Sequence, residues 1–462
     1  MLLANTGKLG TETPPTDNGG GHGLWVRSKA GQFYQCHDIG NVILMYPAAW
    51  VSSILSKSPV AARIQSPPIL ARVATALTYS VLSAVGCFFM FRLFALYYSV
   101  RTAFLLSFGF VTTTIFWPYT KSAWDVLGAS CFVCILLYFS ARLLTSHSPL
   151  TSAINMGLAA AFACSFRFSL TPFLLVSVGI ILYYSRRNIS VGICAVCAVA
   201  FITGIFPTLV YNYVRMGSPL RPATMAEAYV TAGTADISGN IFSGLYGLII
   251  SPNKGLLIFA PIFVLLLFLP FVWKKTSLQT QQICTAFGIG AVLHILFLAK
   301  IRGWGSFGWG PRYLVSVLPI LFFLASVPLK AFWKTNRPPL IALSSLSAAL
   351  CLAPSLVNWH LALTEYPQAL NPYALLPYQH MAVWKGVFLG LQGRPLPAPE
   401  ALLSDPIRSG GARFPDLWTV RLMEHSHTGL VIGLLISTGL IVAAIWAFRQ
   451  LIRQRTLEMI RS

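Results

Sequence analysis

Long apolar segments separated by short polar connections run along most of the chain. About eleven of these segments reach or approach the ~20 mostly apolar residues that a helix needs to cross a bilayer. A shorter apolar stretch, residues 42–56, contains Pro47 and suits a helix that lies in the membrane interface. The pattern predicts an all-α polytopic membrane protein with about eleven transmembrane helices, one interfacial helix and long loops on the outer face. The predicted spans are residues 70–91, 102–118, 124–142, 150–166, 169–185, 190–214, 255–273, 283–299, 312–329, 339–357 and 428–448.

The composition favours a membrane protein over a soluble one. Of the 462 residues, 56% are hydrophobic and only 10% are charged, whereas a soluble chain carries roughly 25% charged residues. The formal charge of +21 would also suit nucleic acid or anionic lipid. We attribute it mostly to membrane topology and expect no nucleic-acid partner. All cysteines except Cys36 lie in apolar segments, where we interpret them as small apolar residues rather than metal ligands.

Basic residues gather in the connections on one side of the predicted spans. With the C-terminus in the cytoplasm, every cytoplasmic connection is short and basic, as the positive-inside rule requires. All of the twelve acidic residues except Glu458 then fall on the opposite face. We therefore expect a multi-pass protein of a bacterial inner or plasma membrane whose active site faces outward. The basic residues are Arg92, Arg101, Arg142, Arg186, Arg187, Lys274, Lys275, Lys330, Lys334, Arg337, Arg449, Arg453, Arg455 and Arg461.

Four regions follow from this arrangement. Residues 1–68 are predicted to form an outer-face loop with the interfacial helix. Residues 69–357 form the transmembrane core, which includes the outer loop 215–254. Residues 358–427 form another long outer loop, and residues 428–462 hold the last span and a basic cytoplasmic tail.

Two acidic residues at predicted span ends are candidate catalytic groups. Asp38 follows Tyr34 and His37 in the stretch GQFYQCHDIGN, just before the interfacial segment. A carboxylate in such a place can deprotonate a hydroxyl group, although an exposed loop aspartate is commonly only solvated. Asp125 lies at the outer mouth of a span, where ionisable groups are costly and tend to be functional. Alternatively, Asp125 pairs with Lys121 and caps the start of a helix.

Two further segments combine basic residues with irregular backbone. Residues 241–262 contain Lys254 within a break made by proline, asparagine and glycine, which suits a phosphate group or an ordinary helix start. Residues 300–314, KIRGWGSFGWGPRYL, carry arginines that suit phosphate binding and tryptophans that suit stacking on sugars or an aromatic belt. The candidate binding residues here are Arg302, Trp304, Trp309, Arg312 and Tyr313.

With these motifs the chain resembles the polyprenyl-phosphate-sugar-dependent glycosyltransferases of the C superfamily, which include protein O-mannosyltransferases and the lipid A aminoarabinose transferase. The resemblance covers most of residues 1–330. It is carried by the pieces GKLG, GQFYQCHDIGN, PYTKSAWDVLG, YNYVRMGSPL, GLYGLIISPNKGLLIFAP and WGPRYLVSVLP, of which the last two are the most characteristic. Residues 358–427 match no piece of the family and are expected to bind the acceptor.

The resemblance implies a lipid-linked donor whose phosphate is held by basic residues, and a carboxylate that acts as base on the acceptor. Asp38 and Asp125 match acids of the family, Arg312 matches the arginine of WGPRY, and Lys254 falls in the loop on the phosphate side. Relatives carry their leading acid just after a first transmembrane helix, whereas this chain opens at MLLANTGKLG and shows no signal peptide. Either residues 42–56 cross the membrane or an N-terminal helix is missing, and we favour the second explanation.

The sequence therefore predicts a membrane glycosyltransferase that moves a sugar from a polyprenyl-phosphate donor to a lipid, glycan or protein acceptor on the outer face. We assign no cofactor, although a pair of carboxylates can hold a divalent cation. The alternatives are a transporter or lipid-linked sugar flippase, and a truncated relative without activity. A transporter often shows internal repeats and midplane ionisable residues, and the sequence displays neither.

Overall fold

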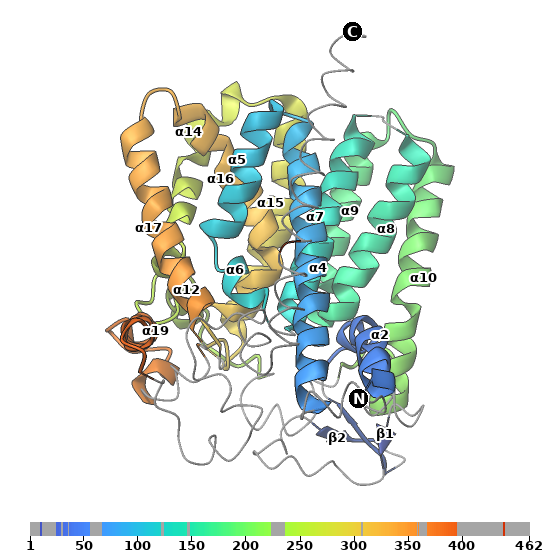
Figure 1. Ribbon diagram of the computed structural model, residues 1–462. Helices are drawn as coiled ribbons and strands as arrows, with labels where there is room; N and C mark the ends of the chain where they lie inside the picture. The colour runs from blue at the N-terminus through green and yellow to red at the C-terminus, as the bar shows by residue number, and fades with distance from the viewer. Residues whose placement is uncertain are drawn as a thin grey trace.

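Long, roughly parallel helices form the body of the molecule, and a small sheet and short crossing helices lie at one end of them (Figure 1). The computed structural model describes residues 10–11, 25–28, 31–35, 37–55, 67–121, 124–145, 148–222, 236–305, 308–357, 359, 367–394 and 438. Within these residues, 8 helices are long and apolar enough to cross a membrane. The protein is therefore an integral membrane protein whose membrane part is helical, as the sequence predicts.

The described elements follow one another as short strands, then helices. The strands are β1 (Gly10–Thr11), β2 (Trp25–Arg27) and β3 (Phe33–Gln35). The α-helices are α2 (Ile39–Leu55), α4 (Pro67–Ala95), α5 (Val100–Thr112), α6 (Phe116–Tyr119), α7 (Asp125–Leu144), α8 (Pro149–Phe166), α9 (Thr171–Ser185), α10 (Val191–Met216), α12 (Ile241–Ile249), α13 (Leu256–Phe259), α14 (Leu269–Val272), α15 (Leu278–Lys300), α16 (Leu318–Phe332), α17 (Arg337–Leu356) and α19 (Tyr378–Leu391). The 3-10 helices are η2 (Phe168–Leu170), η4 (Pro261–Phe268), η5 (Trp273–Lys275), η6 (Arg312–Val317) and η7 (Pro367–Leu370).

Eight of the predicted spans coincide with the eight long apolar helices. Two of the remaining three are interrupted, and the third lies outside the described residues. The predicted span 102–118 contains α5, which is only 13 residues long, followed by the single turn α6. The predicted span 255–273 is broken into α13, η4 and α14. The predicted span 428–448 lies outside the described residues, apart from residue 438.

The break in residues 255–273 has a local cause. Pro261 and Pro270 each lack a backbone N–H and cannot continue the hydrogen-bond ladder of a preceding α-helix. Between them the chain forms the 3-10 helix η4 of 8 residues, longer than such helices usually run. The N–H of Ile262 at its start donates instead to Ser347 Oγ of α17, at 2.8 Å. Hydrophobicity alone predicted a span here, and the prolines prevent a continuous one.

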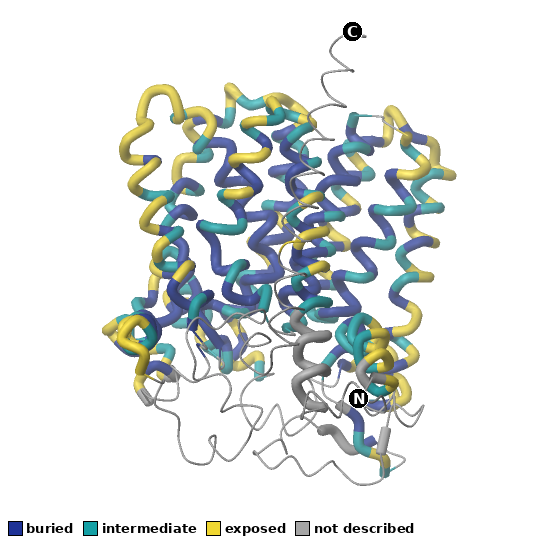
Figure 2. Tube along the Cα trace, in the orientation of Figure 1, coloured by how far each residue is buried: buried dark blue, intermediate teal, exposed yellow. Residues whose placement is uncertain are grey.

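Helices α7, α8 and α10 form the most tightly packed part of the bundle. Helix α7 is the most deeply buried of the membrane-spanning helices that the structure describes. Small residues allow this approach, as is common between membrane helices. An added Cβ at Gly157 of α8 would come within 2.3 Å of the carbonyl oxygen of Cys197 in α10. Buried positions accordingly run through the centre of the bundle, with exposed ones along its outside (Figure 2).

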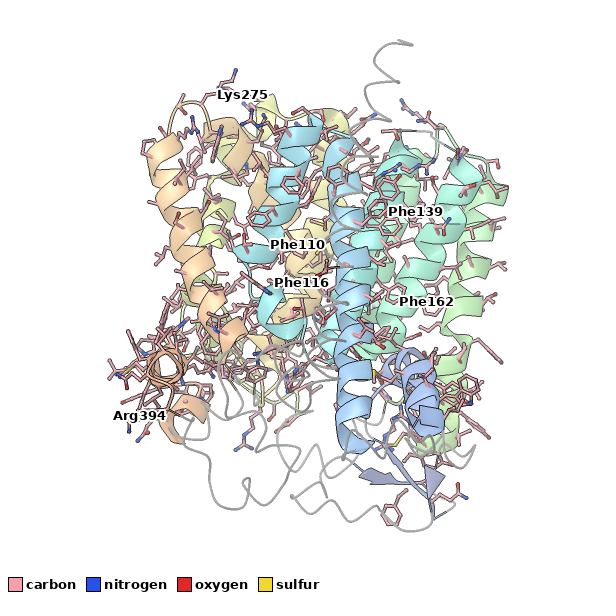
Figure 3. The ribbon with its side chains drawn as sticks, viewed as in Figure 1. Phe110, Phe116, Phe139, Phe162, Lys275 and Arg394 are labelled. Carbon is pink, nitrogen blue, oxygen red and sulfur yellow. The ribbon has the colours of Figure 1, made fainter. Side chains whose placement is uncertain are left out.

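One end of the bundle, which we call the sheet end, holds the irregular structure (Figure 1). The three strands form an antiparallel sheet in the order β1-β3-β2, which the sequence pattern did not predict. The predicted interfacial helix is α2, which lies at this end and exposes Ile43, Trp50 and Ile54. Described parts of all three predicted outer loops also lie here. Figure 3 shows Arg394, in the predicted outer loop 358–427, at the sheet end and Lys275, in a predicted cytoplasmic connection, at the opposite end.

Candidate functional site

The dipeptide Arg167–Phe168, where helix α8 meets η2, contacts both predicted catalytic acids. Asp125, the first residue of α7, accepts a hydrogen bond from Arg167 Nη1 at 3.2 Å. The next residue, Phe168, donates its backbone N–H to Asp38 Oδ2 at 2.9 Å. The two acids, 87 positions apart in the sequence (125 − 38), are therefore held by adjacent residues. They are also close enough to repel each other electrostatically.

Arg167 is a site residue that the sequence did not single out. The alternative that Lys121 is the partner of Asp125 is wrong. The ammonium group of Lys121 donates instead to the backbone carbonyls of Ser355 and Val357, at 3.3 and 2.6 Å. The guanidinium of Arg167 also lies 4.4 Å from the ring centre of Tyr313. The available signal was an arginine in a very short connection between two apolar segments.

Asp38 lies in a more enclosed environment than the sequence suggested. Asp38 is only 6% exposed, so it is not a solvated loop aspartate. Arg215 Nη2 of α10 lies 3.9 Å from Asp38 Oδ1, which accepts no hydrogen bond from the described residues. Burial raises the pKa of Asp38 from 3.8 to about 6, against the opposing effects of the Phe168 N–H and Arg215. Such a carboxyl group can gain or lose a proton near neutral pH.

Arg215 is the second residue that the sequence did not single out, although it lies in the quoted piece YNYVRMGSPL. It is 1% exposed. Its Nη1 donates to the carbonyl of His37 at 2.9 Å, and its Nη2 donates to Asn212 Oδ1 at 2.8 Å. Its guanidinium lies 3.8 Å from the ring centre of Tyr211. We call Asp38, Asp125, Arg167 and Arg215 the carboxylate side of the site.

The residues that were predicted to bind phosphate lie on irregular backbone beside the carboxylate side. Arg312, at the start of η6, packs its guanidinium 4.9 Å from the ring centre of Trp124 and 4.8 Å from that of Tyr313. Its Nη2 donates to the Tyr313 hydroxyl at 3.1 Å. Arg312 interacts electrostatically with both Asp125 and Lys254. We call Lys254 and Arg312 the cation side.

Lys254 is buried rather than extended into solvent. It is 1% exposed, and its Nζ donates to the carbonyl of Gly308 at 2.7 Å. Burial, reinforced by the positive charge of Arg312, lowers the pKa of Lys254 from 10.5 to about 7. An anion bound nearby would favour the protonated form and reverse part of this shift.

The turn that precedes Arg312 is held from several directions. The Tyr119 hydroxyl donates to the carbonyl of Trp309 at 2.7 Å. Gln379 Oε1, from α19, accepts from the Gly310 N–H at 2.8 Å. Gly310 has φ +56°, and an added Cβ there would come within 2.7 Å of the Phe259 ring, so the glycine is required. Tyr119 and Gln379 were not predicted as site residues. Tyr119 lies in the quoted piece PYTKSAWDVLG, where Asp125 was the residue singled out, and Gln379 lies in the loop 358–427, which matches no piece of the family.

Of the other predicted binding residues, two tryptophans are buried and one arginine is exposed. Trp309 is buried against the Phe259 and His380 rings. Trp304 is buried edge-on to Tyr373, in contact with Gly247 of α12. Arg302 has a side chain that is 74% exposed and lies 3.9 Å from Asp236, so it joins neither side of the site.

Tyr34 and His37 lie next to the carboxylate side. Tyr34, in β3, packs edge-to-face on Tyr211 at 6.4 Å between ring centres, and its hydroxyl donates to Gln32 at 2.9 Å. His37 interacts electrostatically with Asp125. His37 therefore lies near Asp125, whereas its sequence neighbour Tyr34 reaches this side through Tyr211, on which Arg215 stacks.

The charges of the site favour an anionic ligand. Arg167, Arg215 and Arg312 outnumber Asp38 and Asp125 by one, before Lys254 is counted. Guanidinium groups stacked on aromatic rings suit phosphate and sugar recognition. Among the described residues, no group of three or more histidine, cysteine, aspartate or glutamate side chains is placed to hold a metal ion. The two acids face arginines, and we therefore assign no step to a divalent cation.

No known protein family, curated protein or solved structure matches the chain. The resemblance to polyprenyl-phosphate-sugar-dependent glycosyltransferases therefore remains a prediction from short motifs.

Proposed function

We propose that the protein is a membrane glycosyltransferase. It would transfer a sugar from a polyprenyl-phosphate donor to an acceptor on the outer face of the membrane. The sheet end of the bundle would then face outward, with the polyprenyl chain of the donor in the lipid and its phosphate at the site.

The observation that supports this proposal is that four residues singled out separately from the sequence lie close enough to influence one another electrostatically. Asp38 interacts with Asp125, Asp125 with Arg312, and Arg312 with Lys254. These residues come from four motifs spread over residues 38–312. Transfer from a sugar phosphate needs a base for the acceptor and positive charge for the leaving group. This cluster has carboxylates on one side and cations on the other.

The two carboxylates suit different roles in such a reaction. Asp125 forms a hydrogen-bonded ion pair with Arg167, which stabilises its charged form and reduces its strength as a base. Asp38 has a pKa raised to about 6, mainly by burial, and one oxygen without a hydrogen bond from the described residues. Its pKa is close to that of an effective general base. We therefore assign the base to Asp38 and the positioning of Arg167 to Asp125.

The transfer would proceed in one displacement. Asp38 takes the proton from the acceptor hydroxyl or amine as its oxygen or nitrogen bonds to the anomeric carbon. The bond between that carbon and the phosphate oxygen breaks, and its electron pair leaves with the polyprenyl phosphate. Arg312 and protonated Lys254 stabilise the negative charge that develops on the phosphate. A single displacement inverts the configuration at the anomeric carbon.

A transporter or lipid-linked sugar flippase is the second candidate. The specific observation in its favour is the broken segment of α13, η4 and α14, because transporters often place substrate sites at discontinuous helices. In that case Arg312 and Lys254 would bind the phosphate during translocation, and no sugar would be transferred to an acceptor.

Radiolabelled sugar transfer in membranes tests the proposal. Membranes that contain the protein would receive polyprenyl-phosphate donors carrying mannose, glucose or aminoarabinose. We expect Asp38→Asn to lower the transfer rate by about 100-fold or more, as for loss of a general base. Arg312→Ala should lower it strongly as well. The matched control is Arg302→Ala, from the same motif but exposed and outside the cluster, which should leave transfer unchanged.

Two outcomes would reject the enzyme. Movement of donor across the membrane without any transfer product would favour the flippase. Equal transfer by the wild type and by Asp38→Asn and Arg312→Ala would remove both site assignments.

A further inference from the structure

Helix α19 lies across the bundle at the sheet end, viewed along its axis in Figure 1 beside the upright α17. It is 14 residues long, which gives ~21 Å at a rise of 1.5 Å per residue, less than the ~30 Å of a bilayer core. It therefore cannot cross a membrane. It belongs to the predicted outer loop 358–427, for which the sequence offered no comparable motif.

One face of α19 is fixed to the protein by buried amides. Gln379 donates its backbone N–H to Asn253 Oδ1 at 3.0 Å and its Nε2 to the carbonyl of Ala369 at 3.0 Å. Asn253 Nδ2 in turn donates to the carbonyls of Gln368, Ala369 and Asn371, at 2.7 to 3.1 Å. Both amide residues are 0% exposed. This inner face joins α19 to the loop of Lys254 and to the turn before Arg312.

The opposite face is apolar and exposed. Met381, Lys385 and Phe388 recur at the spacing of one helix face, and all three are exposed. Phe388 is 61% exposed and Leu391 is 69% exposed. Leu375, shortly before the start of α19, is 80% exposed. A large apolar surface of this kind marks a contact with a partner or a membrane.

We propose that this outer face of α19, formed by Met381, Lys385, Phe388 and Leu391, binds the interface of the lipid bilayer. Its surface is continuous with the sides of the membrane-spanning helices. The neighbouring α17 exposes Ile341, Leu346 and Leu352, and exposed positions run along α17 and around α19 in Figure 2.

A lipid occupant also accounts for the lysine in the apolar face. The methylene stem of Lys385 can lie along acyl chains while its ammonium group reaches the phosphates of the headgroups. Arg394, at the sheet end in Figure 3, adds a second cation just after the helix. A surface between protein chains would instead have to desolvate these charges.

The proposal has a consequence for the site. Gln379 sits on the inner face of α19 and holds Gly308 and Gly310, which precede Arg312. A lipid contact on the outer face therefore stabilises the backbone that carries the cation side. This inference does not depend on the reaction that the site performs.

Lipid quenching tests the proposal on the full chain. A fluorescent amino acid would replace Phe388 in protein reconstituted into nanodiscs of phosphatidylcholine and phosphatidylglycerol. The position is exposed, so the fold should be retained. Lipids brominated near the headgroups should quench about half of the fluorescence or more, as expected for a residue at the headgroup boundary. Lipids brominated at the chain ends should quench less.

Two other positions calibrate the result. Phe206 on α10 is 60% exposed and should be quenched by lipid. Asn188, exposed in the connection between α9 and α10, should be quenched by aqueous iodide. The proposal is overturned if the probe at residue 388 responds like the one at residue 188. It is also overturned if neither lipid nor iodide quenches residue 388, because another protein surface then covers it.

Discussion

The two sides of the site are built from different kinds of backbone. On the carboxylate side, the charged groups lie in or directly beside continuous helices, and each acid has an arginine as its partner. On the cation side, Lys254 and Arg312 lie beside broken helices, and their backbone is held by Tyr119 and Gln379 from distant segments. The carboxylate side is therefore stabilised by helix packing, and the cation side by individual buried hydrogen bonds.

Removing Arg167 should give the largest effect on stability. Arg167→Ala leaves the mostly buried carboxylate of Asp125 without its hydrogen-bonded partner, which should cost about 3–5 kcal/mol of unfolding free energy. Thermal unfolding of purified protein in detergent measures the loss. Arg302→Ala, which breaks an exposed pair, should change the midpoint little. If both variants shift the midpoint equally, the ion pair of Arg167 has no special structural role.

The pH dependence of stability should have opposite signs on the two sides. Asp38 has a pKa near 6 in the folded protein against 3.8 as its ordinary value, so the folded state holds the extra proton. Stability from this group is complete below pH 3.8 and falls as pH rises through 6, by at most about 3 kcal/mol. Lys254 has a pKa near 7 against 10.5. The unfolded state holds that extra proton, so stability rises between pH 7 and 10.5.

Two variants separate these slopes. Asp38→Asn should flatten the fall in unfolding free energy between pH 4 and 6, whereas Lys254→Met should flatten the rise above pH 7. Thermal midpoints across the pH range check both. A wild-type profile without either slope would show that neither group has a shifted pKa.

Removing Gln379 should have a smaller and more local effect. Gln379→Ala leaves the Gly310 N–H and the Ala369 carbonyl without this partner, at a cost of about 1–3 kcal/mol. Hydrogen exchange should increase in residues 308–312 and stay unchanged in α7. Gln392→Ala is the matched control, because Gln392 is exposed just after the same helix. Faster exchange in α7 as well would mean that the two sides are not independently stabilised.

Much of the helical framework could be predicted from the sequence, because each long apolar segment carries its own signal. Asp38, Asp125, Lys254 and Arg312 were also visible, as ionisable residues at the ends of apolar segments. The partners were not, because Arg167 meets Asp125 only through the packing of α7 against α8. The alternative partner Lys121 was suggested by its position four residues before Asp125, but its side chain reaches the carbonyls at the end of α17.

The irregular regions were harder to predict from the sequence, because their contacts also depend on segments brought together by folding. The strands of residues 10–35 are only two or three residues long, too short for a periodic pattern. Gln379 and Asn253 are uncharged amides whose importance comes from the carbonyl groups brought to them by folding. No pattern within their own segments indicates those acceptors.

The Arg167–Phe168 dipeptide links the two acids. Because Arg167 donates a hydrogen bond to Asp125 and the N–H of the next residue donates one to Asp38, a displacement of this peptide unit would disturb the hydrogen bonds of both carboxylates at once. A residue inserted at this point would therefore alter the surroundings of both acids without replacing either of them.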